Sequence, residues 1–95
     1  MKIVESLENL RNLEKAGVLR LVLLLSAKEM SIIELRKFLG QYALYSAIET
    51  LKKLGLIEDT REEIFPRRRL LKLTQKGRKI ALLIKQINDI LEKEH

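Results

Sequence analysis

The spacing of hydrophobic residues predicts helices over most of the chain. Apolar residues recur every three or four positions over residues 3–15, which predicts an amphipathic N-terminal helix. Residues 18–26 are apolar on nearly every side, as in a buried helix, and Gly17 separates the two segments. The chain therefore begins with two helical segments, of which the second belongs to the core.

A second helical pair is marked by its end signals. Ser31 and Glu34 have the spacing of a capping box, in which each side chain accepts a hydrogen bond from the other residue's backbone amide. A short helix is expected from there to Leu39, ended by Gly40, with its inward residues at Ile32, Ile33 (in part), Leu35 and Leu39. The next helix is expected from Gln41 to Leu54, followed by Gly55 in the left-handed conformation; its buried face would carry Leu44, Ala47, Ile48, Leu51 and Leu54.

The spacing of hydrophobic residues then changes from that of a helix to that of β-strands, and it returns to that of a helix near the end of the chain. Residues 56–60 and 67–73 are expected to be two strands, and the only proline, Pro66, fits the loop between them. Strand alternation would place Arg67 and Arg69 on one face and Arg68 on the other. Thr74 is a suitable N-cap for a last helix that reaches about Lys93, near 30 Å long at about 1.5 Å per residue.

Composition limits the chemistry that the chain can perform. Its 95 residues make one domain, 1–95, with no cysteine and a single histidine at the last position, so cysteine or histidine catalysis and metal sites of those ligands are close to excluded. We expect no enzyme, no metal and no cofactor. The longest apolar run, residues 21–25, is far shorter than a membrane span, and no signal pattern opens the chain, so a cytoplasmic protein is expected.

Positive charge is concentrated in one region. Residues 61–79 carry eight basic and two acidic side chains, which accounts for the whole net charge of +6. Such a patch is typical of nucleic-acid binders, although a charge run is by default a solvated surface.

The order helix, short helix, helix, hairpin, long helix carries a resemblance to a known family. The stretches "AIETLKKLGLIED" and "LLKLTQKGRKIA", within residues 18–84, look like the winged helix-turn-helix domain of small prokaryotic, especially archaeal, transcriptional regulators of MarR, PadR or ArsR type. The resemblance implies a mainly α fold with a small β-hairpin (α+β). It divides the chain into an N-terminal helix (3–15), a helix-turn-helix with its wing (18–73) and a C-terminal dimerisation helix (74–93).

The same resemblance makes residues 41–54 the recognition helix, which would enter the major groove of double-stranded DNA. At about 100° per residue, the face opposite the core carries Tyr42, Ser46, Glu49 and Lys53, with Gln41 and Tyr45 at its edge. Gln41 could bond adenine, and Ser46 a base edge or a phosphate. Glu49 could accept from a cytosine amino group or be neutralised by Lys53. The tyrosines could contact DNA or pack against a neighbouring helix or a partner subunit.

The hairpin becomes the wing, and its arginines become candidates for contact with phosphates or the minor groove. They are Arg61, Arg67, Arg68 and Arg69. The lysines and arginine at positions 76, 78 and 79 lie where a helix dipole disfavours cations, which hints weakly at an anionic partner.

The two outer helices could cover the core or form a homodimer. One winged-helix core does not readily bury a 30 Å apolar stripe, so a two-fold dimer is expected, with half-sites near 34 Å apart. Its interface would contain Ile3, Leu7, Leu10, Ile80, Leu83, Ile84, Ile87 and Leu91.

Three functions remain open at this point. The first is a dimeric, sequence-selective transcriptional regulator, for which no effector is identified. The second is a nonspecific architectural or chromatin protein, and the third is a protein-binding winged helix within a larger transcription or replication assembly.

Overall fold

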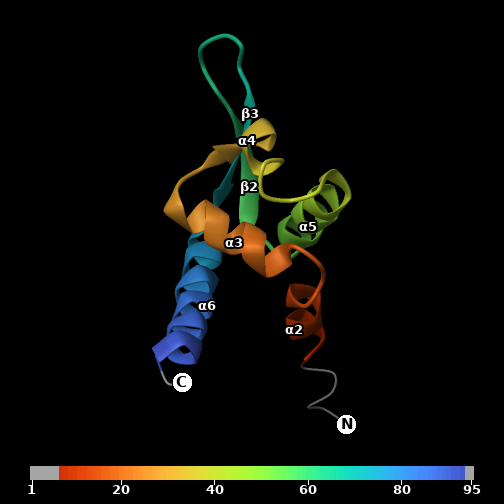
Figure 1. Cartoon of the computed structure of the whole chain (residues 1–95). Helices are drawn as coiled ribbons and strands as arrows, with labels where there is room; N and C mark the ends of the chain where they lie inside the picture. Colours follow the sequence, from red (N-terminus) through yellow and green to blue (C-terminus); the bar gives the residue numbers. More distant parts are fainter. Residues whose placement is uncertain (1–6, 94–95) are drawn as a thin grey trace.

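The computed structural model describes residues 7–93 (Figure 1). It is mainly helical with one small antiparallel sheet, which confirms the predicted fold class. The elements are α2 (Glu8–Leu13), α3 (Val18–Ala27), β1 (Met30–Ser31), α4 (Ile32–Leu35), α5 (Gln41–Lys53), β2 (Ile57–Arg61), β3 (Arg69–Leu73) and α6 (Gln75–Lys93).

Helix α3 is the centre of the core, as its apolar composition predicted. It contacts α5, α6 and β3, and four of its side chains are buried: Val18, Leu21, Val22 and Leu25. The inward face of α5 is also confirmed, since Leu44, Ala47, Ile48 and Leu51 are all buried. Packing of these two helices against the sheet fixes which side of α5 remains in solvent.

The sheet has three strands in the order β1-β3-β2, one more than the hairpin that the sequence predicted. Met30 and Ser31 pair with Leu71 and Leu70 of the central strand. Two residues are too few to show the alternation of a strand in the sequence, so this strand is recognised only by its pairing with β3 in the structure.

The second strand of the hairpin begins later than predicted. β3 starts at Arg69, which pairs with Arg61 on β2, while Arg67 and Arg68 precede it. Arg67 has a φ of 57°, in the left-handed region, and its amide donates to the Ile64 carbonyl to close a turn. The alternation predicted for three strand arginines is therefore wrong, because a turn at the tip replaces the first two strand positions.

The capping box forms as predicted, but the helix that it starts is shorter. The Glu34 amide donates to the Ser31 hydroxyl at 3.2 Å, and the Ser31 amide to the Glu34 carboxylate at 3.0 Å. This second bond lowers the pKa of Glu34. α4 ends at Leu35, and Ile33, which was expected to face partly inward, is 62% exposed. Residues 36–38 form turns instead of continuing the helix, while Leu35 and Leu39 are buried as expected.

The carbonyl end of α5 is held by the start of α6. Gly55 takes the predicted left-handed conformation, with φ 75°. The Thr74 hydroxyl donates to the Gly55 carbonyl at 2.7 Å and accepts from the Gly77 amide at 3.0 Å, so Thr74 is the predicted N-cap. The Lys76 ammonium donates to the Leu54 carbonyl at 2.9 Å. These bonds satisfy backbone groups that a helix end otherwise leaves to water.

The outer helices project away from the wing. Figure 1 shows α2 and α6 descending on the side of the core opposite the hairpin. α2 ends at Leu13, two residues short of the prediction, and the expected start at residues 3–6, with Ile3, lies outside the described residues. α6 runs to Lys93 as predicted. Its buried residues are Gly77 and Ala81, which the predicted stripe did not include.

Candidate nucleic-acid interface

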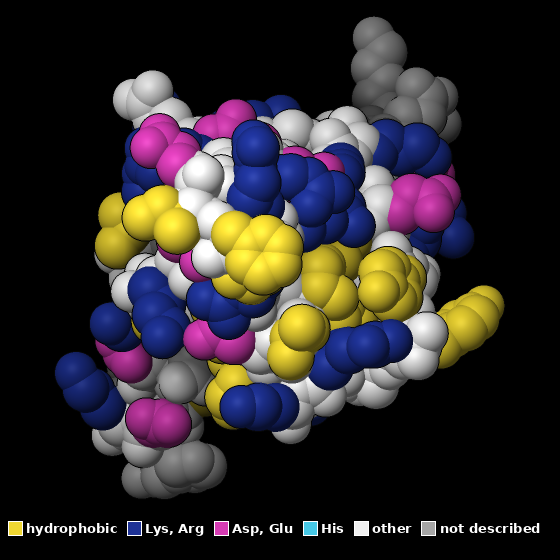
Figure 2. Space-filling model, turned by 90° about the horizontal axis from the view of Figure 1, so that it is seen from above, with side chains coloured by type: hydrophobic (Ala, Val, Ile, Leu, Met, Phe, Trp, Pro, Cys, Tyr) yellow, Lys and Arg dark blue, Asp and Glu magenta, His cyan; other side chains and the backbone are white. Residues whose placement is uncertain are grey.

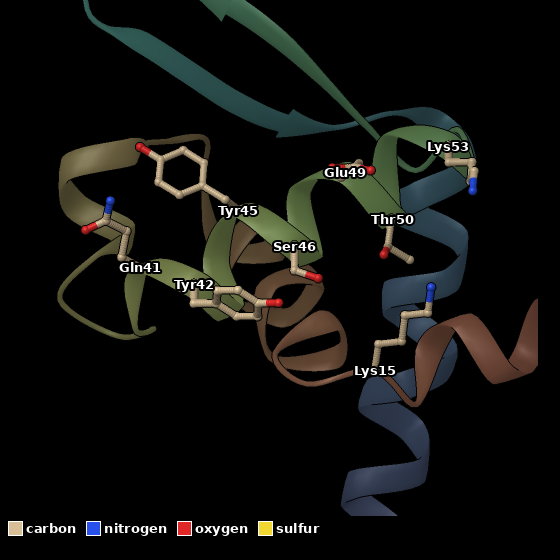
Figure 3. Close-up of a pocket in the computed structure, with 8 residues that line it drawn as sticks. All are labelled: Lys15, Gln41, Tyr42, Tyr45, Ser46, Glu49, Thr50 and Lys53. Atoms are coloured by element: carbon tan, nitrogen blue, oxygen red, sulfur yellow. The ribbon is translucent and has the colours of Figure 1, made fainter.

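The outward face of α5 is a row of polar and aromatic side chains (Figure 3). The predicted residues Gln41, Tyr42, Tyr45, Ser46, Glu49 and Lys53 all lie in solvent. Tyr42 is 89% exposed and Tyr45 is 41% exposed, so neither is buried by a neighbouring helix of its own chain. The structure thus brings every predicted recognition-helix residue onto one accessible surface.

This surface is slightly hollowed. An open hollow of about 650 Å³ is lined by the six predicted residues together with Lys15 and Thr50. Lys15 comes from the segment that joins α2 to α3, and Figure 3 shows its side chain extending toward Thr50. Sequence reasoning missed Lys15, because only the tertiary fold brings the segment between α2 and α3 to this face of α5.

The charges on this face are not neutralised by one another. Within residues 7–93, no ion pair links Glu49 to Lys53, although they stand four apart on the helix. Lys52, one position earlier, points to β2 instead and pairs with Asp59. Among the described residues, Glu49 therefore keeps an unpaired carboxylate on the outward face of α5.

Two of the wing arginines are paired within the wing. The Arg68 guanidinium donates to both carboxylate oxygens of Glu62, at 2.9 and 3.1 Å, and its amide donates to the same carboxylate. The hydrogen bond from Arg68 lowers the pKa of Glu62, and the same bond raises the pKa of Arg68. This bidentate pair fastens the two sides of the loop to each other.

Arg69 belongs to a second charge cluster, at the base of the wing. Its guanidinium donates to both carboxylate oxygens of Asp59 at 3.2 Å, and Lys52 of α5 donates to the same carboxylate. Burial raises the pKa of Asp59, but the hydrogen bonds and charges of Lys52 and Arg69 outweigh it, so the pKa is lowered. The cluster links α5 to the wing, which fixes their relative positions.

Arg61 and Arg67 differ from these two. Among the described residues neither contacts a carboxylate, and the Arg61 guanidinium donates to the Arg67 carbonyl at 3.3 Å. Both are exposed. The structure therefore separates the four wing arginines into two that hold the hairpin together and two whose charge is free for another molecule.

Two of the three cations at the start of α6 have partners inside the protein. Lys76 donates to the Leu54 carbonyl, and the Arg78 guanidinium donates to the Leu73 carbonyl at 3.3 Å. Their place near a helix N-terminus is thus explained by carbonyl groups of the neighbouring elements. For these two residues, the position near a helix N-terminus no longer points to an anionic partner.

Two other classes of site do not occur in the described part of the chain. No helix there is long and apolar enough to cross a lipid bilayer. Residues 7–93 also contain no group of three or more carboxylate, histidine or cysteine side chains that could hold a metal ion.

Comparison with known proteins places this geometry in a familiar fold. No family model matches the sequence, and no curated protein matches it. Among solved structures, the transcriptional repressor BigR from Xylella fastidiosa is 26% identical with a TM-score of 0.75, over 97% of this chain and 91% of that one. A protein from Porphyromonas gingivalis W83 assigned to the MarR family is 18% identical with a TM-score of 0.77, over 98% and 91%. The repressor AdcR from Streptococcus pyogenes is 22% identical with a TM-score of 0.71, over 94% and 75%.

These likenesses confirm the winged helix-turn-helix fold and the structural resemblance to MarR-type and ArsR-type regulators. The proteins compared are described as transcriptional regulators and not as enzymes, in agreement with the expectation that this chain is not an enzyme. In the fold that they share, α4 and α5 form the helix-turn-helix and β2 and β3 form the wing.

Proposed function

We propose that this protein is a DNA-binding transcriptional regulator that acts as a homodimer. The observation that carries the proposal is the outward face of α5, where exposed hydrogen-bonding and aromatic side chains stand beside a basic wing in a winged-helix fold. The resemblance to repressors of known structure supports it.

In this proposal α5 lies in the major groove and reads base edges. Gln41 has donors and acceptors that suit adenine, and Ser46 suits a base edge or a phosphate. The unpaired carboxylate of Glu49 can accept from the amino group of cytosine. Tyr42 and Tyr45 supply ring surface for a thymine methyl group or sugar and a hydroxyl for phosphate, while Lys15 and Lys53 add positive charge at one end of the helix.

The wing contacts phosphates or the minor groove through Arg61 and Arg67. Arg68 and Arg69 shape the wing, because their charges are already satisfied by Glu62 and Asp59. Only two of the four wing arginines are then available to DNA. This favours a regulator that combines base contacts with a few phosphate contacts over an architectural protein that binds through charge alone.

The dimer forms through α6 with the help of α2. Toward its C-terminal end the helix leaves the core, and four of its apolar residues are exposed: Leu83, Ile87, Ile90 and Leu91. Leu7 and Leu10 of the N-terminal segment are exposed as well. Ile80 and Ile84, included in the predicted interface, pack partly against the core of their own subunit and contribute less. A stripe of this kind is stable in water when a second copy covers it.

The first test is selection of bound duplexes from a random DNA pool. The expected result is enrichment of a two-fold symmetric sequence with half-sites about 34 Å apart. In the variant Glu49→Gln, preference at one base pair in each half-site should move from cytosine toward adenine, because an amide suits adenine. Enrichment of no sequence, with binding retained, would favour the architectural function. Absence of binding at low salt would favour the protein-binding function.

A second test separates the two kinds of wing arginine. Arg67→Asn removes an unpaired charge, and asparagine tolerates the left-handed backbone at this position. Affinity should fall for all sequences alike, and the slope of log affinity against log salt should decrease by about 0.9 for each phosphate that is no longer neutralised. The matched control is Lys85→Gln, which removes one exposed positive charge from α6, away from the wing, and should leave the salt slope unchanged. Equal slopes in Arg67→Asn and wild type would remove Arg67 from the interface.

Dimerisation is tested by sedimentation equilibrium. Ile87→Glu places a charge in the exposed stripe and should convert the dimer to a monomer at micromolar concentration. Lys85→Glu is the control, because position 85 lies roughly 160° away around the helix. Wild-type protein that sediments as a monomer would contradict this part of the proposal.

A further inference from the structure

The tip of the wing carries three consecutive apolar residues in solvent. Ile64 is 80% exposed and Phe65 is 88% exposed, and Pro66 beside them is exposed too. They occupy the loop between β2 and β3, which extends beyond the helices (Figure 1). Isolated apolar residues on a surface are ordinary, but a run of three is rare unless it contacts another molecule.

The tip is held in shape although its apolar side chains are not covered. The Arg67 amide donates to the Ile64 carbonyl at 2.9 Å, and the Glu62 amide donates to the Arg68 carbonyl at 3.1 Å. Phe65 lies within the turn that the first of these bonds closes. Because the Glu62–Arg68 pair fastens the loop just below, Phe65 is presented on a stiff support rather than on a loose end.

Charge around the tip favours a polyanion over a neutral apolar partner. Arg61 and Arg67 have no carboxylate partner within the described chain, whereas Glu63 is the one acidic side chain of the loop outside the Glu62–Arg68 pair. The uncompensated charge at the tip is therefore positive. Figure 2, a view onto the wing end of the molecule, shows hydrophobic side chains near the middle of this face bordered by Lys and Arg.

The size of a hairpin limits how it can meet a duplex. Two paired strands lie about 4.8 Å apart, before their side chains are added. A minor groove about 6 Å wide and about 7.5 Å deep cannot admit such a ribbon, but it admits the side chains of a turn. Apolar side chains that enter a minor groove commonly insert between base steps and partly unstack them.

We infer that the wing tip is a minor-groove wedge, in which Phe65 inserts at a base step while Arg61 and Arg67 contact the flanking phosphates. Ile64 packs against the sugars beside it. The inference rests on the proposed DNA-binding function and adds a contact that reads how easily a base step unstacks, in addition to the base edges read by α5. Flexible pyrimidine–purine steps such as dT–dA would be preferred under the wing.

The experiment uses a duplex of alternating dA and dT in which 2-aminopurine replaces some adenines, because its fluorescence rises when the base unstacks. Wild-type protein should raise the fluorescence at saturation. Phe65→Ala should bind about tenfold more weakly and give no rise when saturated, because it removes one aromatic ring that stacks on a base. Phe38→Ala is the matched control. Phe38 is the only other phenylalanine, is about half exposed and lies on the turn after α4, so this variant should behave as wild type.

A second measurement reports from the tip itself. The chain contains no tryptophan, so the indole introduced by Phe65→Trp is the only one present. Its fluorescence should be quenched by the duplex, as expected for a ring stacked on bases, while that of Phe38→Trp should not change.

The outcomes separate the wedge from the function on which it rests. If Phe65→Ala binds the duplex as wild type does and raises the fluorescence equally, the wedge is refuted and the DNA-binding function stands. If Phe65→Ala instead loses binding to vesicles of phosphatidylcholine and phosphatidylserine, with DNA binding unchanged, the tip is a membrane contact and the wedge is refuted. If wild-type protein binds no duplex at low salt, both proposals fail together.

Discussion

A methyl group added at Gly77 should disrupt the packing of the start of α6 against the end of α5. Gly77 lies in the first turn of α6 and is buried. A Cβ atom at this position would lie 2.0 Å from the Leu56 carbonyl oxygen and 3.2 Å from a Leu73 methyl carbon. The first distance is about 1 Å shorter than real Cβ atoms tolerate, and its partner is backbone, which cannot rotate away. Either α6 or the chain at Leu56 must move.

The size of the effect follows from what such a movement disturbs. The Leu56 carbonyl accepts a hydrogen bond from the Thr74 amide at 2.9 Å, which joins the α6 N-cap region to the end of α5. Overpacking costs about 1–3 kcal/mol and the loss of a hydrogen bond about 1 kcal/mol, whereas alanine improves helix propensity by at most about 1 kcal/mol. Gly77→Ala should therefore lower the free energy of unfolding by about 1–3 kcal/mol, a large part of the stability of a domain of this size.

Urea unfolding followed by circular dichroism measures this change. The control is Gly40→Ala, because a Cβ atom there meets nothing within 4 Å and its φ of −59° is open to any residue. Its unfolding free energy should change by less than about 1 kcal/mol, because two small effects oppose each other. Alanine reduces the conformational entropy of the unfolded chain, which stabilises the fold, but it is a less favourable N-cap residue than glycine, which destabilises α5. A Gly77→Ala variant with the same midpoint and slope as wild type would refute the close packing of α6 on Leu56.

Three further predictions concern single contacts. Ser31→Ala removes the hydroxyl half of the capping box and should lower the free energy of unfolding by about 1 kcal/mol; no change in a urea titration would show that the box does not stabilise the fold. Gly55→Ala forces a side chain onto a φ of 75° and should cost about 1 kcal/mol, although the position is spacious, and an unchanged melting temperature would argue against the left-handed turn. Because the pKa of Glu62 is lower in the folded protein than in the unfolded chain, its ion pair adds to the free energy of unfolding at any pH above the unfolded pKa. This contribution should be lost below about pH 5, as the pH falls through the lower folded pKa. Arg68→Gln should raise that pKa toward its ordinary value, which carboxylate NMR titration measures, and an unmoved pKa would contradict the ion pair.

Much of the fold is local and could be predicted from the sequence. The capping box of Ser31 and Glu34, the left-handed Gly55 and the Thr74 cap each depend on residues a few positions apart, so their signals are complete in a short stretch of chain. The buried faces of α3 and α5 follow from helical periodicity in the same way. Two local predictions were wrong or missing. The start of β3 was predicted too early, because Arg67 lies in a turn, and β1 was not predicted, because two residues are too few to show a strand pattern.

The outward face of α5 was also predictable, because the same periodicity that places leucines inside places the other residues outside. The contribution of Lys15 to that face was not, since it depends on where the fold places the segment between α2 and α3. The exposure of the apolar wing tip could not be predicted either, because the sequence "IFP" alone does not show whether these residues lie in the core or in solvent.

By itself, the sequence determined the order of the helices and the hairpin, the inward and outward faces of α5, and the concentration of positive charge in residues 61–79. Only the tertiary structure decided which of those charges are available. Arg68 and Arg69 are neutralised by Glu62 and Asp59 across the hairpin, while Lys76 and Arg78 are satisfied by backbone carbonyls of neighbouring elements. The physical reason is that charge composition is a property of the chain, whereas the pairing of charges depends on distances that only folding sets.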